Sequence, residues 1–366
     1  MARPELHADA IVVTGLAMHS VLGSLQSATA AARAGISLGR ELGFSVLTSG
    51  EEDASVVGHP VASAAGFRGI GKLLCLAFPA LEDLLRAVDF YPRRFDRTGL
   101  CLCLPNPDSW SARHVEPTTE GQAAEIPSSG PELCARLTRL TSVEIPEPDR
   151  EHFDLGHAGL VHAVRSATAR LTAGTWQRCI LGAIDSLLEE RALAWLLRSG
   201  RLKTPDKPDG LQPGEASVFL LLERYDSARR RGAEIMSVIG ETAVASGGKD
   251  ASALPQVVET VLGGPAGPPG GDRWLISDHN GESWRARELA STLVRLSSRF
   301  PHLGADARWL PASSFGDTGA VSAAIAVCLA SRSFARGYAP APAGVVLSSS
   351  DDGASACMRI HAPPAR

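Results

Sequence analysis

The sequence predicts an α/β protein with a largely buried mixed sheet, and two observations carry this prediction. Short apolar segments with β-forming residues alternate with segments of helical periodicity along most of the chain, which is the pattern of a sheet covered by helices. The alternation runs twice, once in each part of the chain, which indicates an internally duplicated fold. A chain of 366 residues that is 44% hydrophobic can form one large core or two medium ones, so disorder is excluded as the main state.

In the first part of the chain, apolar runs ended by glycine or polar residues predict strands, and segments of helical periodicity predict helices. Pro79 lies inside the longest helical pattern and is expected to kink it. Residues 106–131, rich in Pro, Ser and Thr, are expected to form a surface excursion. The expected strands cover residues 10–16, 98–104, 152–155, 179–184 and 217–222, and the expected helices cover residues 27–33, 70–88, 133–140, 158–171 and 189–197.

The second part of the chain repeats this alternation after a Pro-rich loop at residues 203–214. A Gly/Pro-rich loop at residues 263–271 separates its first helix from its second strand. The expected strands cover residues 237–240, 274–277, 344–348 and 356–360, and the expected helices cover residues 254–262, 285–297 and 320–330.

Charge and hydropathy narrow the class of function. Lys and Arg total 36 against 40 Asp and Glu, a formal charge of −4, so there is no strong basic field and nucleic acid is not an expected partner. No stretch approaches the roughly 20 apolar residues of a membrane span, and the start of the sequence has no apolar run behind a basic flank. We therefore expect a cytoplasmic protein with no membrane partner.

The seven cysteines form an odd, dispersed set, which makes a disulfide framework unexpected. Cys101 and Cys103 alternate on an apolar strand and have no second cluster beside them, so we expect buried core residues and no metal site. The segment from Gly66 to Leu73 nearly fits a phosphate-binding loop. Leu73 stands where a Ser or Thr is needed, however, and no strand precedes the segment. It is expected to be the start of a helix, and no cofactor is expected.

Several segments, in this order and spacing, carry a family resemblance across nearly the whole chain. They cover residues 11–23, 181–186 (Leu-Gly-Ala-Ile-Asp-Ser), 200–204, 208–216, 220–234, 314–323 and 348–354. Together they resemble the beta-ketoacyl synthases (3-oxoacyl-[acyl-carrier-protein] synthases), which are thiolase-like condensing enzymes of fatty acid and polyketide synthesis. The resemblance implies a five-layer αβαβα fold of two duplicated halves, at residues 1–232 and 233–366, with the site between them.

The resemblance also implies partners. In the family, the strand before the nucleophile pairs across a twofold axis, and the matching segment here runs from Arg150 through Phe153 to Leu155. We therefore expect a homodimer, or a heterodimer with a ketosynthase, and acyl carrier protein as a possible further partner. An ordinary internal strand would have the same local sequence.

The family reaction needs a cysteine at a strand-to-helix turn to hold the acyl chain as a thioester. The position that matches it here is His157, and no cysteine lies between Cys134 and Cys179. An acyl-imidazole would hydrolyse readily. We therefore interpret His157 as a polar residue retained at the turn and not as a nucleophile.

The family also uses two histidines that donate hydrogen bonds to the malonyl carbonyl. Asn280 matches the first, with His279 one residue away, so that a shift of one residue would place His279 there. Asp317 matches the second, and an aspartate there is suited to capping the following helix. The family lysine and the aromatic gate are also absent, with residues 311–314 and 348–353 in their places.

Losing the nucleophile, both histidines and the lysine leaves no route to acyl holding or decarboxylation. The leading hypothesis is a non-catalytic ketosynthase homologue that organises an active condensing enzyme or its carrier protein, as chain-length factors of aromatic polyketide synthases do. The alternative is an acyltransferase or thioester hydrolase that uses His157 and Asp317 in a retained acyl pocket. The alternative requires these two side chains within hydrogen-bond reach, beside a pocket that admits a chain.

Overall fold

The computed structural model describes residues 7–88, 90, 95–106, 130–247, 253–264 and 273–364. The surface excursion expected at 106–131 and the loop expected at 263–271 lie mostly outside the described residues. The remaining expected strands and helices are present, with bounds that differ by a few residues. In the part of the chain that the structure describes, no helix has both the length and the hydropathy needed to cross a membrane.

The strands form one 11-stranded mixed sheet with the order β11-β10-β12-β13-β9-β1-β8-β7-β5-β6, and β2 (Gly23–Ser24) pairs with β1. The strands of the first half are β1 (Ile11–Ser20), β5 (Thr98–Cys103), β6 (Arg150–Phe153), β7 (Arg178–Ser186) and β8 (Glu215–Arg224). Those of the second half are β9 (Ser237–Ser246), β10 (Trp274–Ser277), β11 (Ala307–Trp309), β12 (Ala343–Ser349) and β13 (Ala354–His361).

The two halves have the same topology. In each half the strands lie in the order first, fifth, fourth, second and third, counted along the chain. The first and fourth strands are antiparallel to the fifth, while the second is parallel to the third and fourth. An antiparallel pairing of β1 with β9 joins the halves. This repeat is the internal duplication that the sequence predicts; the expected boundary between residues 232 and 233 stays a prediction.

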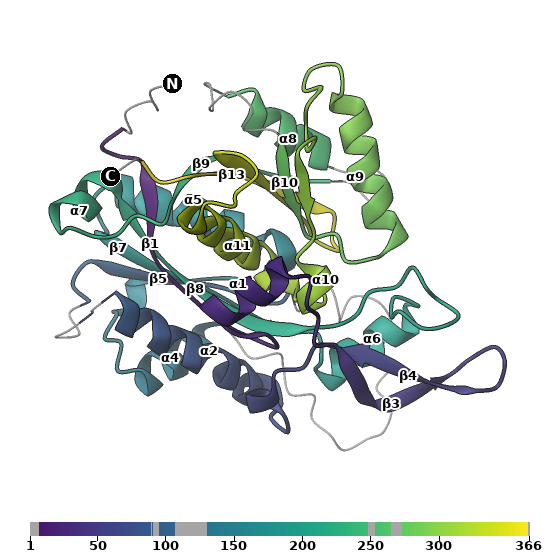
Figure 1. Cartoon of the computed structure of the whole chain (residues 1–366). Coiled ribbons are helices and arrows are strands. Elements are labelled where there is room, and N and C mark those ends of the chain that lie inside the picture. The colour runs from purple at the N-terminus through teal and green to yellow at the C-terminus, as the bar shows by residue number, and fades with distance from the viewer. Residues whose placement is uncertain are drawn as a thin grey trace.

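The helices complete five layers (Figure 1). Helices α5 (Gly159–Thr172) and α11 (Ser322–Arg336) lie between the two parts of the sheet. Helices α2 (Gly69–Ala87) and α4 (Gly130–Leu140) cover the outer face of one part, and α8 (Leu254–Leu262) and α9 (Ser283–Leu296) cover the outer face of the other. The shorter helices are α1 (Leu25–Arg33), α6 (Glu190–Arg198), α7 (Tyr225–Arg230) and α10 (Ala312–Phe315). This is the αβαβα arrangement that the resemblance implies.

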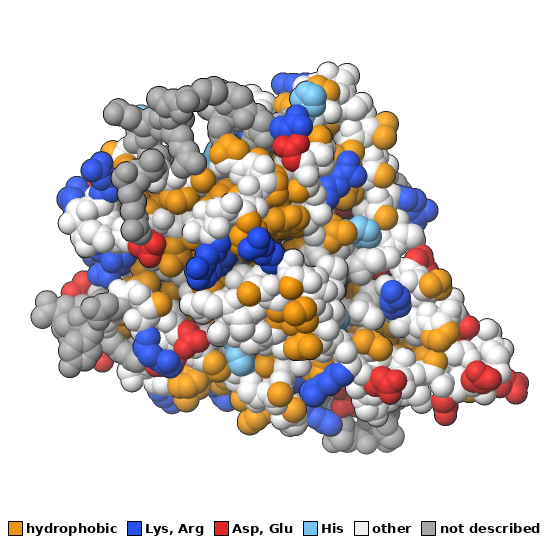
Figure 2. Space-filling view, in the orientation of Figure 1, with side chains coloured by type: hydrophobic (Ala, Val, Ile, Leu, Met, Phe, Trp, Pro, Cys, Tyr) orange, Lys and Arg blue, Asp and Glu red, His pale blue; other side chains and the backbone are white. Residues whose placement is uncertain are grey.

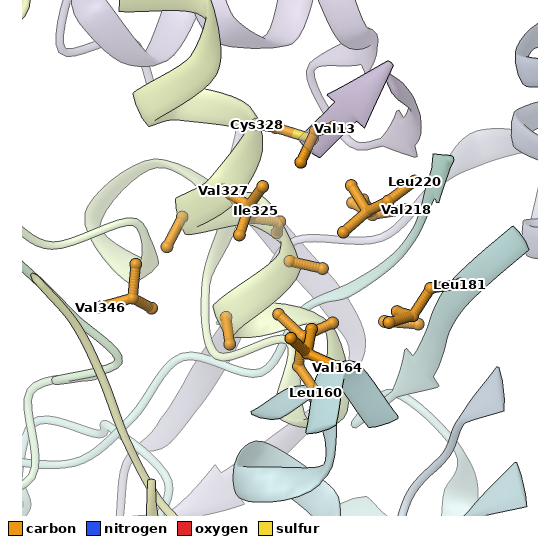
Figure 3. Packing of buried hydrophobic residues seen from close by; sticks show 14 of the residues in the cluster. Val13, Leu160, Val164, Leu181, Val218, Leu220, Ile325, Val327, Cys328 and Val346 are labelled. Atoms are coloured by element: carbon orange, nitrogen blue, oxygen red, sulfur yellow. The ribbon is translucent and has the colours of Figure 1, made fainter. Parts of the chain in front are cut away.

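The largest core cluster lies in the middle layer. Figure 3 shows side chains of α5 and α11, among them Leu160, Val164 and Ile325, packed beside Val218 and Leu220 of β8. All five of these side chains are fully buried, and burying a side chain of this size contributes roughly 1.5–3 kcal/mol. Helix α11 is buried from Ser322 to Ser331, as expected for a helix covered by sheet on two faces, whereas α5 buries one side and carries Arg165 and Arg170 on the other.

Two local predictions need revision. Strands β3 (Arg40–Leu47) and β4 (Asp53–Gly58) form a hairpin that was not expected, which projects from the body of the molecule in Figure 1. The helix expected at 320–330 begins as a 3-10 turn at Gly319–Val321, continues as α11 and ends at Arg336. Helix α2 runs through Pro79 from Gly69 to Ala87.

Candidate functional site

The site lies where the two central helices begin, because equivalent glycine turns precede them. Gly156, before α5, has φ of 58°, and Gly319, before α11, has φ of 56°. Only glycine adopts this left-handed conformation readily, and each glycine opens a 3-10 turn. A Cβ atom on Gly319 would lie 2.1 Å from Asp185 Oδ2, so the close approach also requires glycine there. These turns bring His157 and Asp317 face to face.

The structure brings together the three residues that the sequence analysis selected. Asp317 accepts hydrogen bonds from three donors. Its Oδ1 accepts from His157 Nε2 and from the Gly319 amide, both at 2.9 Å, and its Oδ2 accepts from Asn280 Nδ2 at 2.6 Å. The bond from the Gly319 amide is a local bond within the turn and not the helix cap that the sequence analysis expects of Asp317, because Thr318 is the N-cap of the 3-10 turn and Val321 that of α11. All three side chains are buried, with exposed fractions of 5% for His157, 9% for Asn280 and 2% for Asp317.

The contact between His157 and Asp317 is an ion pair. Burial by itself would lower the pKa of His157, but the Asp317 carboxylate outweighs it and leaves that pKa raised. Burial would raise the pKa of Asp317, but His157 and then Arg285 outweigh it and hold that pKa well below the usual value for an aspartate. Asp317 is therefore an ionised acceptor, which cannot donate a hydrogen bond to a carbonyl oxygen.

Asn280, and not its neighbour His279, takes part in the site. Asn280 Nδ2 also donates to Glu282 Oε2 at 2.9 Å, and Asn280 Oδ1 accepts from the Glu282 amide at 3.1 Å. The amide group is therefore fixed in one orientation. His279 Nδ1 instead accepts from the Gly281 amide at 3.4 Å, and burial lowers the pKa of this half-buried imidazole.

Two arginines fill the space around these residues. Arg285 has an exposed fraction of 2%, and its Nη1 donates to Asp278 Oδ2 at 2.9 Å and to the Ser349 carbonyl at 2.6 Å. Its Nη2 lies 3.5 Å from His157 Nε2. The positive charge of Arg285 beside His157 helps keep Asp317 ionised.

Arg201 joins three separate segments. Its guanidinium binds Glu282 with Nε to Oε1 at 2.6 Å and Nη2 to Oε2 at 2.7 Å. It also binds Asp351 with Nη1 to Oδ2 at 2.9 Å and Nη2 to Oδ1 at 3.0 Å. Burial would lower the pKa of Arg201, but these two carboxylates raise it above the usual value. Arg201 therefore stays charged and ties the first half of the chain to the second with two bidentate contacts.

The space that remains is small. A pocket of about 20 Å³ opens beside His157, and Asp185, Ser350 and Asp351 are among the residues that line it. This is room for about one water molecule, whereas pockets for small organic ligands are about 300–1,000 Å³. Burial raises the pKa of Asp185 to about 7, although its carboxylate accepts hydrogen bonds from the Ala320 and Ser186 amides. No cysteine is among the residues that line this pocket.

The residues that sequence reasoning rejected as functional have structural roles. Lys72, in the loop that nearly fits a phosphate-binding motif, lies in α2 and forms a buried ion pair with Glu215, with Nζ 3.1 Å from Oε2. All seven cysteines are unpaired, and all but Cys75 are buried. Cys103, which packs beside Gly159 at the start of α5, is fully buried, and burial raises the pKa of its thiol well above the usual value. No group of side chains suited to a metal ion is found among the described residues.

Sequence reasoning did not select Arg201, Glu282, Arg285, Asp351 or Asp185. Charged residues in loops and at helix ends usually lie in solvent, and these five come from four separate segments of the chain. Two of them could have been selected from the sequence. Glu282 and Arg285 follow Asn280 within one short segment, which places their side chains near the same turn.

Comparisons with known proteins identify the fold. Neither a family model nor a curated protein matches the sequence. Among solved structures, a chain from a complex of a type II polyketide synthase acyl-carrier protein with its ketosynthase, bound to a hexaketide, is similar with a TM-score of 0.78 and 14% identity; the match covers 98% of this chain and 100% of that one. The ishigamide ketosynthase/chain length factor is similar with a TM-score of 0.74 and 15% identity, and the match covers 97% of this chain and 99% of that one.

A third similar structure is a ketosynthase domain of oxazolomycin synthesis from Streptomyces albus JA3453, with a TM-score of 0.75 and 15% identity; the match covers 98% of this chain and 75% of that one. All three cover almost the whole of the present chain at low identity. The chain therefore has the thiolase-like ketosynthase fold.

Proposed function

We propose that this chain is a non-catalytic ketosynthase homologue that pairs with an active condensing enzyme, or organises its carrier protein, in an acyl-chain synthesis system of the fatty acid or polyketide type. The observation that carries the proposal is the ion pair of His157 with Asp317 at the start of the two central helices. We take these residues, with Asn280, to occupy the family's catalytic positions. His157 has no sulfur and so cannot hold an acyl chain as a thioester, and the ionised Asp317 would repel a malonyl carboxylate.

The arginine side chains that occupy the space beside His157 support the same proposal. Arg201 and Arg285 occupy the space beside His157, and each is held by carboxylates and surrounded by buried groups. An acyl chain would have to displace the buried Arg285 and the partly buried Arg201 from their carboxylates, and breaking a buried ion pair costs about 3–5 kcal/mol. The site is therefore built for rigidity and not for binding a chain.

An acyltransferase or thioester hydrolase is the second candidate, and one observation favours it. His157 and Asp317 are within hydrogen-bond distance, as a base and its orienting carboxylate would be. The pocket beside them holds only about 20 Å³, however, and so does not admit an acyl chain. The first proposal therefore accounts for more of the site.

The exposed edge of β6 supports the pairing. This strand binds β5 on one side and ends the sheet on the other, so its outer backbone groups have no strand partner among the described residues. Edges of this kind favour pairing with another chain. Phe153, at the end of β6, is half-buried against the main core cluster. We propose that a second copy, or a ketosynthase, binds along Arg150, Phe153 and Leu155.

Analytical ultracentrifugation of the purified full-length chain, alone and mixed with a type II ketosynthase, tests the proposal. We expect a dimer in at least one of the two samples, and we expect Phe153→Asp to produce monomers. Val294→Asp is the matched control, because Val294 lies on α9 with 73% of its surface exposed. Circular dichroism confirms that each variant is folded. A chain that stays monomeric in both samples contradicts the pairing and favours the second candidate.

A further inference from the structure

We propose that Arg33, Arg332 and Arg336 form a binding site for a phosphoryl group, on the surface where helices α1 and α11 end. This phosphoryl site, as we call these three residues together with Tyr338, is independent of the proposed function. Helix α11 begins at the candidate site and is 15 residues long, so its far end lies roughly 20 Å away. The pocket beside His157 contains none of these residues.

The end of α11 fixes the geometry of the phosphoryl site. Gly337 has φ of 69°, its amide donates to the Phe334 carbonyl at 3.3 Å, and the Tyr338 amide donates to the Ser333 carbonyl at 3.1 Å. These are the two bonds of a Schellman motif, which ends the helix and turns the chain back. Tyr338 is thereby held over the last turn of the helix, on which Arg332 and Arg336 are four residues apart and so share one face.

Tyr338 is the centre of the cluster. The Arg33 guanidinium lies over its ring, with Cζ 3.9 Å from the ring centroid. The Trp309 ring is stacked at a centroid distance of 6.3 Å. Burial raises the pKa of Tyr338, while the positive charges of Arg33, Arg332 and Arg336 act in the opposite direction. At neutral pH the hydroxyl stays protonated and can donate a hydrogen bond.

The described part of the protein neutralises the positive charge of the cluster only in part. Within the described ranges, neither Arg33, Arg332 nor Arg336 forms an ion pair with an acidic side chain, and Arg332 Nε is buried without a hydrogen-bond partner. Arg33 and Arg336 are the last residues of their helices. Two helix C-termini contribute about −0.5 charge each, which offsets only about one of the three positive charges. Figure 2 shows basic side chains near the centre of this face, where Figure 1 places α1 and α11, with hydrophobic side chains around them.

A phosphoryl group matches this cluster better than a carboxylate does. It carries −1.5 to −2 charges at neutral pH and three acceptor oxygens, which suits about two uncompensated charges from three guanidinium groups. Guanidinium groups bind phosphate oxygens in bidentate geometry, and these charge-assisted bonds are about twice as strong as neutral ones. The phosphoryl group can belong to a small phosphate ester or to a phosphorylated side chain of a partner protein.

Isothermal titration calorimetry of the full-length protein with inorganic phosphate at low ionic strength tests the site. We expect saturable binding that Arg332→Gln and Arg336→Gln each weaken about tenfold or more, because each removes one charge-assisted donor. Arg198→Gln is the matched control: Arg198 is the exposed last residue of α6, and the substitution removes the same charge from the same helix position. It should leave the affinity nearly unchanged.

No saturable binding of phosphate, or an equal loss of affinity in Arg198→Gln, overturns the proposal. Acetate that binds as tightly as phosphate overturns the assignment to a phosphoryl group. A phosphoserine peptide and its unphosphorylated form distinguish the two sources of ligand. A phosphopeptide that binds more tightly than inorganic phosphate indicates a phosphorylated partner, and equal affinities indicate a small phosphate ester; either result supports the site.

Discussion

His157 Nε2 lies 2.9 Å from Asp317 Oδ1, and this contact joins the two halves of the chain at the position where their central helices begin. Both side chains are buried, and both are held by further groups: Asp317 by Asn280 and the Gly319 amide, His157 by its position after the Gly156 turn. The carboxylate occupies Nε2 of the imidazole, so this ring nitrogen is not available to attack an acyl group while the pair is formed.

The first prediction concerns the pH dependence of this pair. The raised pKa of His157 gives stability that is fully present below its unfolded value of 6.5 and is lost as pH rises through the folded value. The lowered pKa of Asp317 gives stability that is present above its unfolded value of 3.8 and is lost as pH falls. The pair should therefore stabilise the fold most between about pH 4 and pH 6.5.

Urea unfolding of the wild type and Asp317→Asn at a series of pH values measures this contribution. We expect the variant to lose about 3–5 kcal/mol in its free energy of unfolding near pH 5.5, with a smaller loss once the pH exceeds the raised pKa of His157 and the imidazole is neutral in both states. A difference that does not change with pH contradicts the ion pair.

The second prediction concerns Arg201. Arg201→Gln leaves the buried Glu282 without its bidentate partner and should lower the free energy of unfolding by about 3 kcal/mol or more. Arg224→Gln is the matched control, because Arg224 also binds two carboxylates, those of Asp9 and Asp226, but in a more exposed position. Arg224→Gln should lower the free energy of unfolding by at most about 1 kcal/mol. Equal costs in urea unfolding would show that the Arg201 contacts do not hold the site together.

The third prediction concerns the glycine turn before α11. Gly319→Ala adds both the strain of a positive φ and a contact with the Asp185 carboxylate. Gly35→Ala adds only the strain, since Gly35 has φ of 71° and no atom within 4 Å of the new Cβ. We expect Gly319→Ala to lower the free energy of unfolding by about 1–3 kcal/mol more than Gly35→Ala does. Thermal and urea unfolding measure the loss of stability in each variant. Equal losses in Gly319→Ala and Gly35→Ala would contradict the close contact with Asp185.

The fourth prediction is that His157→Cys does not restore condensation. The new thiol would stand beside Asp317, whose negative charge opposes formation of a thiolate. Asn280 is already bound to Asp317 and Glu282, so no pair of donors remains for a malonyl carbonyl. Carbon dioxide release from a malonyl carrier protein, measured with the variant, should stay at background, and release at a ketosynthase rate would refute the account of these positions.

Much of the fold follows from local sequence patterns. The helix at Leu254–Leu262 has the expected bounds because an apolar face and Pro255 in the first turn both indicate its start. The strand Trp274–Ser277 is a short apolar run between a Gly/Pro loop and a polar turn. The hairpin of β3 and β4 was missed, although Leu42, Phe44 and Val46 alternate with more exposed residues and pack on one cluster.

The site was only partly predictable for a physical reason. His157, Asn280 and Asp317 were selected because the segments around them match motifs of the family that the sequence resembles. The contacts of Arg201 with Glu282 and Asp351 join residues 81 and 150 positions apart, and no local pattern encodes which loop a long charged side chain will reach. Burial of a charge is decided by the packing of all three loops, which only the folded chain determines.

The most direct test of the central claim is mass spectrometry of the wild-type protein after incubation with an acyl thioester and malonyl carrier protein, with carbon dioxide followed in the same reaction. The His157–Asp317 pair and the absence of cysteine from the pocket predict an unmodified mass of 38.4 kDa and no release of carbon dioxide above background. A stable acyl adduct on any cysteine, or a condensation product, would contradict the claim that the chain is a non-catalytic member of an acyl-chain synthesis system.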